Sequence, residues 1–192
     1  MDQAASDIST CSTDDCPTPT STIMTDTMFA DKKDIVVPIA AAPHVEHHLV
    51  ANRSFMIRTR QKPHLYLTLE HGELKLLENI TVGGGWLWYC FKNCGWYGFR
   101  NTVSGTYLGH AWWDDRHRLL ANAPHHRADE YFIADRQTDG GYTLLARKDD
   151  QLLPVVISEF HMLLGQAEEA NGTAWEFVDT KFINMQVLLK HL

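Results

Sequence analysis

The sequence predicts an all-β domain, and three observations support this fold class. From residue 54 onward, apolar runs of five to eight residues are separated by glycine-containing turn signals, a spacing typical of strands. A 44% share of hydrophobic residues in a chain of 192 residues is enough to fill the core of one domain. Motifs also recur along this region at a nearly constant spacing, which indicates a repeated β unit.

Each predicted unit holds four strands, and the same strand types follow one another three times. The first strand of each unit lies at residues 55–58, 97–100 and 142–145. The second is an apolar triplet at residues 65–67, 106–108 and 151–153. The third contains a Leu-Leu pair at residues 76–77, 119–120 and 163–164. The fourth is an aromatic strand at residues 86–88, 131–133 and 175–177.

The spacing of these motifs predicts a three-fold architecture. The Leu-Leu pairs are 43 and 44 residues apart, and the aromatic strands are 45 and 44 residues apart. A four-stranded unit of this size cannot bury its apolar faces alone, whereas three units around one axis share a core. We therefore predict a β-trefoil of three four-stranded repeats, with six strands in a short barrel and three hairpins that cap one end. Leu76, Leu119 and Leu163 are predicted to be equivalent core residues.

Composition divides the chain into three predicted segments. Residues 1–50 are rich in Ser, Thr, Asp, Pro and Ala, and residues 1–35 carry −5 of the net charge of −7. Such a segment buries too little apolar surface to offset an ordering cost of roughly 1–2 kcal/mol per residue, so we predict a disordered tail. A partner-binding or phosphorylated arm is the alternative. The trefoil domain is predicted over residues 51–180, followed by an amphipathic segment with helical spacing over residues 181–192.

The charge distribution argues against nucleic acid as a partner. Residues 36–192 carry a net charge of only −2, whereas a nucleic-acid binder would show a basic excess. No apolar run approaches the roughly 18 to 20 residues that cross a bilayer, so no membrane partner is expected. The acidic, polar first residues lack the features of a secretory signal, which predicts a cytoplasmic protein. The sequence shows no cofactor fingerprint and no regular metal-ligand spacing, so neither a cofactor nor a metal is expected.

Two short motifs resemble those of fascin-like β-trefoil proteins. Residues 105–108 (Gly-Thr-Tyr-Leu) resemble the Gly-x-Tyr-Leu strand of that family, and residues 175–177 (Trp-Glu-Phe) resemble its Trp-x-Phe closing motif. The resemblance covers residues 54–179, extends to small single-domain fungal β-trefoils and implies a protein partner. Fascins carry several such domains and bundle actin, whereas one domain alone is not expected to crosslink filaments.

A second trefoil family, the ricin-B-like lectins, is similar in repeat length and binds sugars. Its units characteristically close with Gln-x-Trp, and the matching positions at residues 86–88, 131–133 and 175–177 lack the glutamine. The sugar-binding residues of that family therefore have no counterparts that can be carried over.

Trefoil cores are filled by side chains, so a functional site is expected on a hairpin or loop. Counted between leucines, the middle hairpin is the longest, and its loop has the richest chemistry. The candidate ligand-binding residues are His110, Trp112, Trp113, Asp114, Asp115 and His117. An indole packs against a sugar ring or an apolar ligand, and carboxylates accept hydrogen bonds from hydroxyls. Because neighbouring strand residues face opposite ways, we expect one of the two tryptophans to point into the core.

The predicted function is a non-catalytic binding module whose hairpin loops contact a protein partner or a glycan. The alternative is a small enzyme that holds an apolar metabolite in a loop pocket lined by Trp, His and Asp, where a histidine and an aspartate would act as acid and base. The structural interpretation of the same residues is an inward Trp and a solvated turn. The sequence leaves the ligand and the oligomeric state open.

Overall fold

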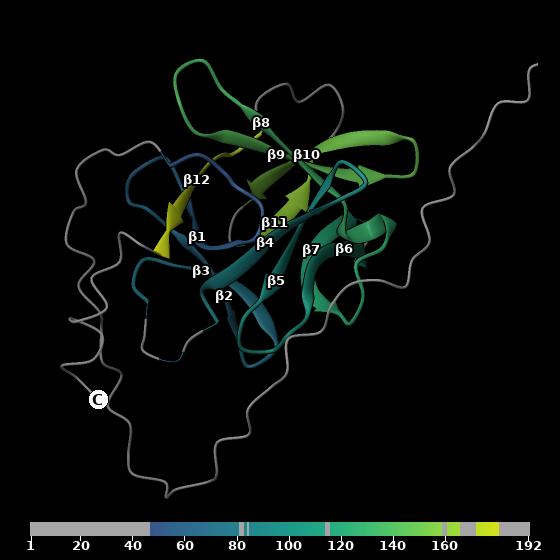
Figure 1. Cartoon of the computed structure of the whole chain (residues 1–192), viewed down its shortest axis with the longest axis horizontal. Coiled ribbons are helices and arrows are strands. Elements are labelled where there is room, and N and C mark those ends of the chain that lie inside the picture. The colour runs from purple at the N-terminus through teal and green to yellow at the C-terminus, as the bar shows by residue number, and fades with distance from the viewer. Residues whose placement is uncertain are drawn as a thin grey trace, which may run out of the picture. The chain divides into compact units, whose positions relative to one another are not determined.

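The computed structural model describes residues 47–80, 83, 85–113, 116–158, 161–165 and 172–180 (Figure 1). The named elements in these ranges are twelve strands and one 3-10 helix, η1 (Ala128–Glu130). The strands are β1 (Arg53–Thr59), β2 (Tyr66–Glu70), β3 (Glu73–Leu77), β4 (Leu87–Asn93), β5 (Trp96–Asn101), β6 (Tyr107–Trp113), β7 (Arg116–Ala123), β8 (Phe132–Arg136), β9 (Tyr142–Lys148), β10 (Gln151–Ser158), β11 (His161–Leu164) and β12 (Ala174–Asp179). The all-β prediction is confirmed. Residues 1–46 of the tail predicted over residues 1–50, and the segment predicted over residues 181–192, lie outside the described residues.

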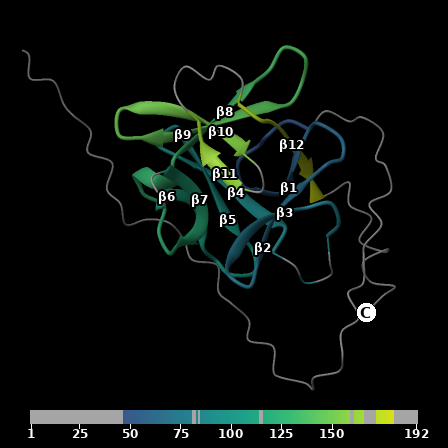
Figure 2. The same ribbon diagram turned by 180° about the vertical axis from the view of Figure 1, so that it is seen from behind.

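Six of the strands close a ring. Antiparallel pairing runs from β1 to β4, β5, β8, β9 and β12, and β12 pairs again with β1 (Figures 1 and 2). The other strands form the hairpins β2–β3, β6–β7 and β10–β11. A closed ring has no unpaired strand edge, so its backbone N–H and C=O groups bond within the sheet.

Aromatic side chains from different parts of the ring fill the core. Phe177 of β12 stacks on Phe99 of β5, with ring centroids 5.6 Å apart, and meets Phe55 of β1 edge-to-face at 6.0 Å. Trp88 of β4 is fully buried, and its indole N–H donates to the Leu67 carbonyl at 2.9 Å. Burial of these rings supplies hydrophobic stabilisation from residues far apart in the sequence.

The prediction that Leu76 and Leu119 are equivalent core residues is wrong. Leu119 is buried opposite His110, but in β3 the buried leucine is Leu74, which lies opposite Leu69, and Leu76 is only half-buried. An alignment of the β2–β3 and β6–β7 hairpins on their Leu-Leu pairs is therefore wrong by two residues, because Leu74, not Leu76, matches Leu119. The side chain of Leu163 lies outside the described residues.

This offset also corrects the relative lengths of the hairpins. Beyond the pair His110–Leu119, the β6–β7 hairpin continues for three more residue pairs. The β10–β11 hairpin continues equally far beyond the pair Val155–Leu164, so the middle hairpin is not the longest. It differs from the other long hairpin in the residues that it carries.

Candidate functional site on the β6–β7 hairpin

The candidate residues lie along the outer half of the β6–β7 hairpin. Trp112 pairs with His117, and Trp113 pairs with Arg116. Figures 1 and 2 show that this hairpin lies next to the β9–β10 hairpin in both views. Asp114 and Asp115, which join the two strands, lie outside the described residues.

Both tryptophans of the hairpin are exposed to solvent. Trp112 is 63% exposed and Trp113 is 55% exposed. The expectation that one of them points into the core is therefore wrong. Alternation does send the two indoles to opposite faces of the hairpin, but the core layer ends at His110 and Leu119, which are buried. Neither face of the outer half is covered by the core.

The two faces of the hairpin differ in chemistry. Residues that pair directly across antiparallel strands point to the same face, so Trp112, His117 and His110 share one face. Trp113 shares the other face with Arg116 and Arg118. The sequence motif thus brings together two half-sites, one indole with imidazoles and one indole with guanidinium groups.

The imidazole face contains a chain of contacts that ends at Trp112. Nε2 of His110 lies 2.7 Å from the backbone carbonyl of Arg147, and its Nδ1 lies 3.2 Å from Nδ1 of His117. The His117 ring then meets the Trp112 indole edge-to-face, with centroids 5.0 Å apart. His110 is buried, whereas His117 is half-buried. The histidine pair therefore connects an exposed indole to the backbone of β9.

Burial shifts the pKa values of His117 and Glu130, two groups near these contacts. Burial and the neighbouring His110 lower the pKa of His117. Glu130 of η1 is buried, which raises the pKa of its carboxyl, although the Arg127 backbone N–H donates to Oε2 at 2.8 Å. Burial removes water from a side chain and so destabilises its charged form. Both pKa shifts therefore favour the neutral forms of His117 and Glu130.

Reasoning from the sequence found the candidate histidines but missed their hydrogen bond. The bond follows once the register Trp112–His117 is known, because His110 then lies on the same face. One signal was present in the hairpin strands, since His110 lies two residues after a strand leucine, where the other hairpins have Leu69 and Val155. The Arg147 carbonyl has no sequence signal, because it is a backbone group 37 residues away.

Another histidine, His126, lies in an aromatic cluster that includes Tyr107 of β6. His126 contacts the rings of Phe91 at 4.5 Å, Tyr131 at 4.8 Å and Tyr107 at 5.9 Å. Both of its ring nitrogens are buried and make no hydrogen bond of good geometry among the described residues. Burial lowers the pKa of His126 against the opposing effect of the Tyr97 and Glu130 backbone, so the folded state favours the neutral imidazole.

We expect the free energy of unfolding to fall as the pH drops below about 6.5, partly because of His126. A pKa that is lower in the folded state means that the unfolded state binds protons first, so stability is lost on acidification, at most about 1.4 kcal/mol per pH unit for one group. Urea unfolding at neutral and acidic pH should show a smaller loss in His126→Leu than in the wild type. His125→Leu, at the exposed neighbour, is the control, and equal pH dependence in both variants would refute this role.

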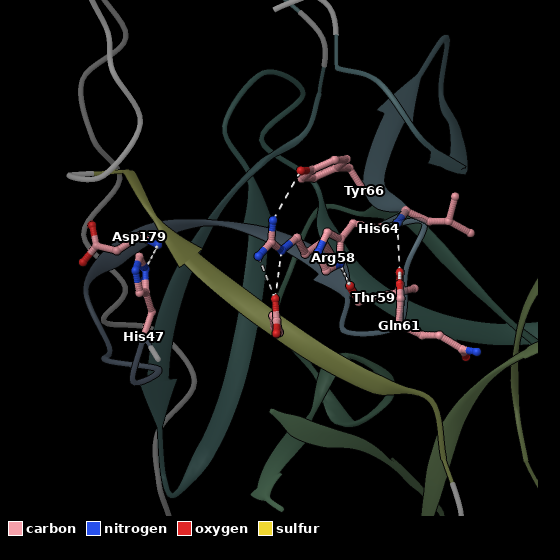
Figure 3. A network of polar contacts seen from close by, with 9 residues as sticks. His47, Arg58, Thr59, Gln61, His64, Tyr66 and Asp179 are labelled. Atoms are coloured by element: carbon pink, nitrogen blue, oxygen red, sulfur yellow. Dashed lines mark hydrogen bonds and ion pairs between the residues drawn. The ribbon is translucent and has the colours of Figure 1, made fainter. Parts of the chain in front are cut away.

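A polar network on the outside of the ring joins its first and last strands (Figure 3). Arg58 of β1 donates through Nε and its terminal nitrogen to Glu176 of β12, at 2.9 and 2.8 Å, and reaches the Tyr66 hydroxyl at 3.5 Å. The backbone N–H of Asp179 donates to Nδ1 of His47 at 2.8 Å. These groups bond with one another across the seam between β1 and β12, which gives the network a structural role.

His47 and Leu49 belong to the last residues of the predicted tail and contact the domain. Besides the bond from Asp179 to His47, the Leu49 backbone N–H donates to the Tyr142 hydroxyl at 3.3 Å, and Leu49 packs against the core. Within the part of the chain that the structure describes, no three His, Cys, Asp or Glu side chains are grouped to hold a metal ion. No helix in the same part is long and apolar enough to cross a membrane.

Comparison with known proteins identifies the fold. No family model and no curated protein matches the chain, but solved structures do. The ricin B-like lectin of Macrolepiota procera, solved with lactose, is 14% identical over 69% of this chain and 99% of its own, with a TM-score of 0.52. The designed three-fold symmetric protein ThreeFoil is 17% identical over 66% of this chain and 98% of its own, with a TM-score of 0.50. The fold is a β-trefoil.

A second lectin shares this β-trefoil architecture. The Polyporus squamosus lectin, solved with the epitope Neu5Acα2-6Galβ1-4GlcNAc, is 12% identical over 69% of this chain and 50% of its own, with a TM-score of 0.50. The structural similarity supports the shared fold. Because the sequence identities are this low, no individual binding residue is transferred to this trefoil.

Proposed function

We propose that this β-trefoil is a non-catalytic glycan-binding module whose ligand contacts the outer half of the β6–β7 hairpin. The observation that carries the proposal is the exposure of two adjacent indoles, Trp112 and Trp113. Indoles are among the largest apolar side chains, and exposed apolar surface that is grouped marks interaction sites. A flat indole with a polar N–H at its edge suits the C–H face and hydroxyl rim of a sugar ring.

The similar solved structures support a glycan as the ligand class. The two fungal lectins were solved with lactose and with a sialylated Galβ1-4GlcNAc epitope, so both ligands contain a galactose unit. Because the sequences are only 14% and 12% identical to this chain, the support extends to the class of ligand alone. Galactosides are therefore the first soluble sugars to test.

The finer, fascin-like assignment would favour a protein partner instead. Trp and Arg are the residues enriched in protein-binding hot spots, and Trp113 lies beside Arg116. The alternative of an enclosed apolar metabolite fits the geometry less well, since the two indoles face opposite ways and hold no ligand between them. The cytoplasmic location, the lack of a nucleic-acid partner and the domain limits at residues 51 and 180 remain predictions from the sequence.

Full-length protein on a glycan array should bind at least one class of glycan, and soluble sugar should compete with that binding. The double variant Trp112→Ala with Trp113→Ala should lose the signal while it keeps the wild-type unfolding midpoint, because both side chains are on the surface.

Sedimentation with actin filaments is the second arm of this experiment. An array without any bound glycan would contradict the proposal. If the protein then sediments with filaments, and the double variant does not, the hairpin binds a protein partner.

A further inference from the structure

One buried position in the β6–β7 hairpin is polar where the other two hairpins are apolar. His110 lies two residues after a buried leucine of its strand, and Leu69 and Val155 lie at the same distance from theirs. All three side chains are buried, with exposures of 6%, 9% and 0%. A buried imidazole is unfavourable unless its nitrogens are hydrogen-bonded, so this histidine needs partners that a leucine would not.

The partners of His110 determine where the protons of the pair lie. A carbonyl only accepts, so Nε2 of His110 must carry the proton that it donates to the Arg147 carbonyl at 2.7 Å. In the neutral ring Nδ1 is then an acceptor, and it receives the Nδ1–H of His117 at 3.2 Å. The unprotonated Nδ1 of His110 is therefore required for the bond between the two histidines.

His117 links His110 to the exposed indole of Trp112. Its ring lies directly opposite Trp112 in the strand register and meets the indole edge-to-face, with centroids 5.0 Å apart. Trp112 has little other cover, since it is 63% exposed. The contact chain from the Arg147 carbonyl through His110 and His117 thus limits the orientations that the indole and its strand can adopt.

We propose that the His110–His117 pair is a positioning device for Trp112. The proposal rests on the proposed function of Trp112 as a ligand contact. The bond needs a protonated Nδ1 on His117 and an unprotonated Nδ1 on His110, so an apolar side chain in place of His110 removes it.

Charges on two neighbouring elements act on His117. From the end of β9 and the turn after it, Lys148 opposes a charge on His117 and Asp149 favours it; from η1, Asp129 favours it. Burial and His110 dominate and lower the pKa of His117, which favours its neutral imidazole.

Nuclear magnetic relaxation of the full-length protein without ligand tests this directly. The backbone N–H order parameters of Ala111, Trp112 and Trp113 should be about 0.85 near pH 7.5. In His110→Leu, which places the residue of the β2–β3 hairpin at this position, they should be below about 0.6 at the same pH. His125→Ala, at an exposed histidine, should behave like the wild type.

Two results would overturn the proposal. The order parameters could be low in the wild type near pH 7.5, or they could stay high in His110→Leu. Amides of the β2–β3 hairpin serve as the internal reference for global loosening. Because no ligand is used, a failed glycan array and a failed positioning role remain separate outcomes.

Discussion

Replacing Trp88 with alanine should lower the free energy of unfolding by about 3–5 kcal/mol, at the upper end of that range. Trp88 is fully buried in the ring, so its loss leaves a cavity that the surrounding aromatic rings cannot fill without moving. The indole N–H also donates to the Leu67 carbonyl at 2.9 Å, and the variant leaves that buried carbonyl without its partner. Urea unfolding monitored by circular dichroism measures this loss.

Trp113→Ala is the matched control for Trp88→Ala. The same side chain is removed, but from a position that is 55% exposed, so the change in unfolding free energy should stay within about 0.5 kcal/mol. Equal losses of unfolding free energy in the two variants would show that the Trp113 indole is part of the core. That result would refute the proposal of a surface site.

The strands were predictable because each one combines an apolar or aromatic run with turn residues on both sides. Every predicted strand segment overlaps an observed strand, from residues 55–58 in β1 to residues 175–177 in β12. The equivalence of Leu76 and Leu119 was not predictable from the Leu-Leu motif. Their pairing partners decide which leucine is buried, and the partners depend on how far each hairpin extends.

The residue content of the candidate site was predictable, but its geometry was not. Strand alternation predicted that Trp112 and Trp113 face opposite ways, yet it could not say where along the hairpin the core layer ends. That end is set by the packing of His110 and Leu119, which are buried, and it leaves both indoles outside. The anchor of the histidine pair, the Arg147 carbonyl, comes from the tertiary arrangement of β6 against β9 and has no sequence pattern.

The second large effect is expected in ligand affinity. Trp112→Ala should weaken glycan binding by about 2 kcal/mol or more, which is roughly 30-fold in Kd. Trp113→Ala should have a smaller effect, below about 1 kcal/mol, because the two indoles lie on opposite faces and one sugar ring stacks on one of them. The larger effect is assigned to Trp112 because His117 already orders it, so less conformational entropy is lost on binding.

Calorimetric titration of the strongest array glycan into the wild type, the two single variants and Tyr89→Ala tests the central claim most directly. Tyr89 is the matched control, since it is a partly exposed aromatic residue on β4, outside the hairpin, with 38% exposure. We predict wild-type affinity for Tyr89→Ala, a small loss for Trp113→Ala and a loss of roughly 30-fold for Trp112→Ala, all with unchanged unfolding midpoints. Wild-type affinity in both tryptophan variants would contradict the account and place the ligand site on another surface of the trefoil.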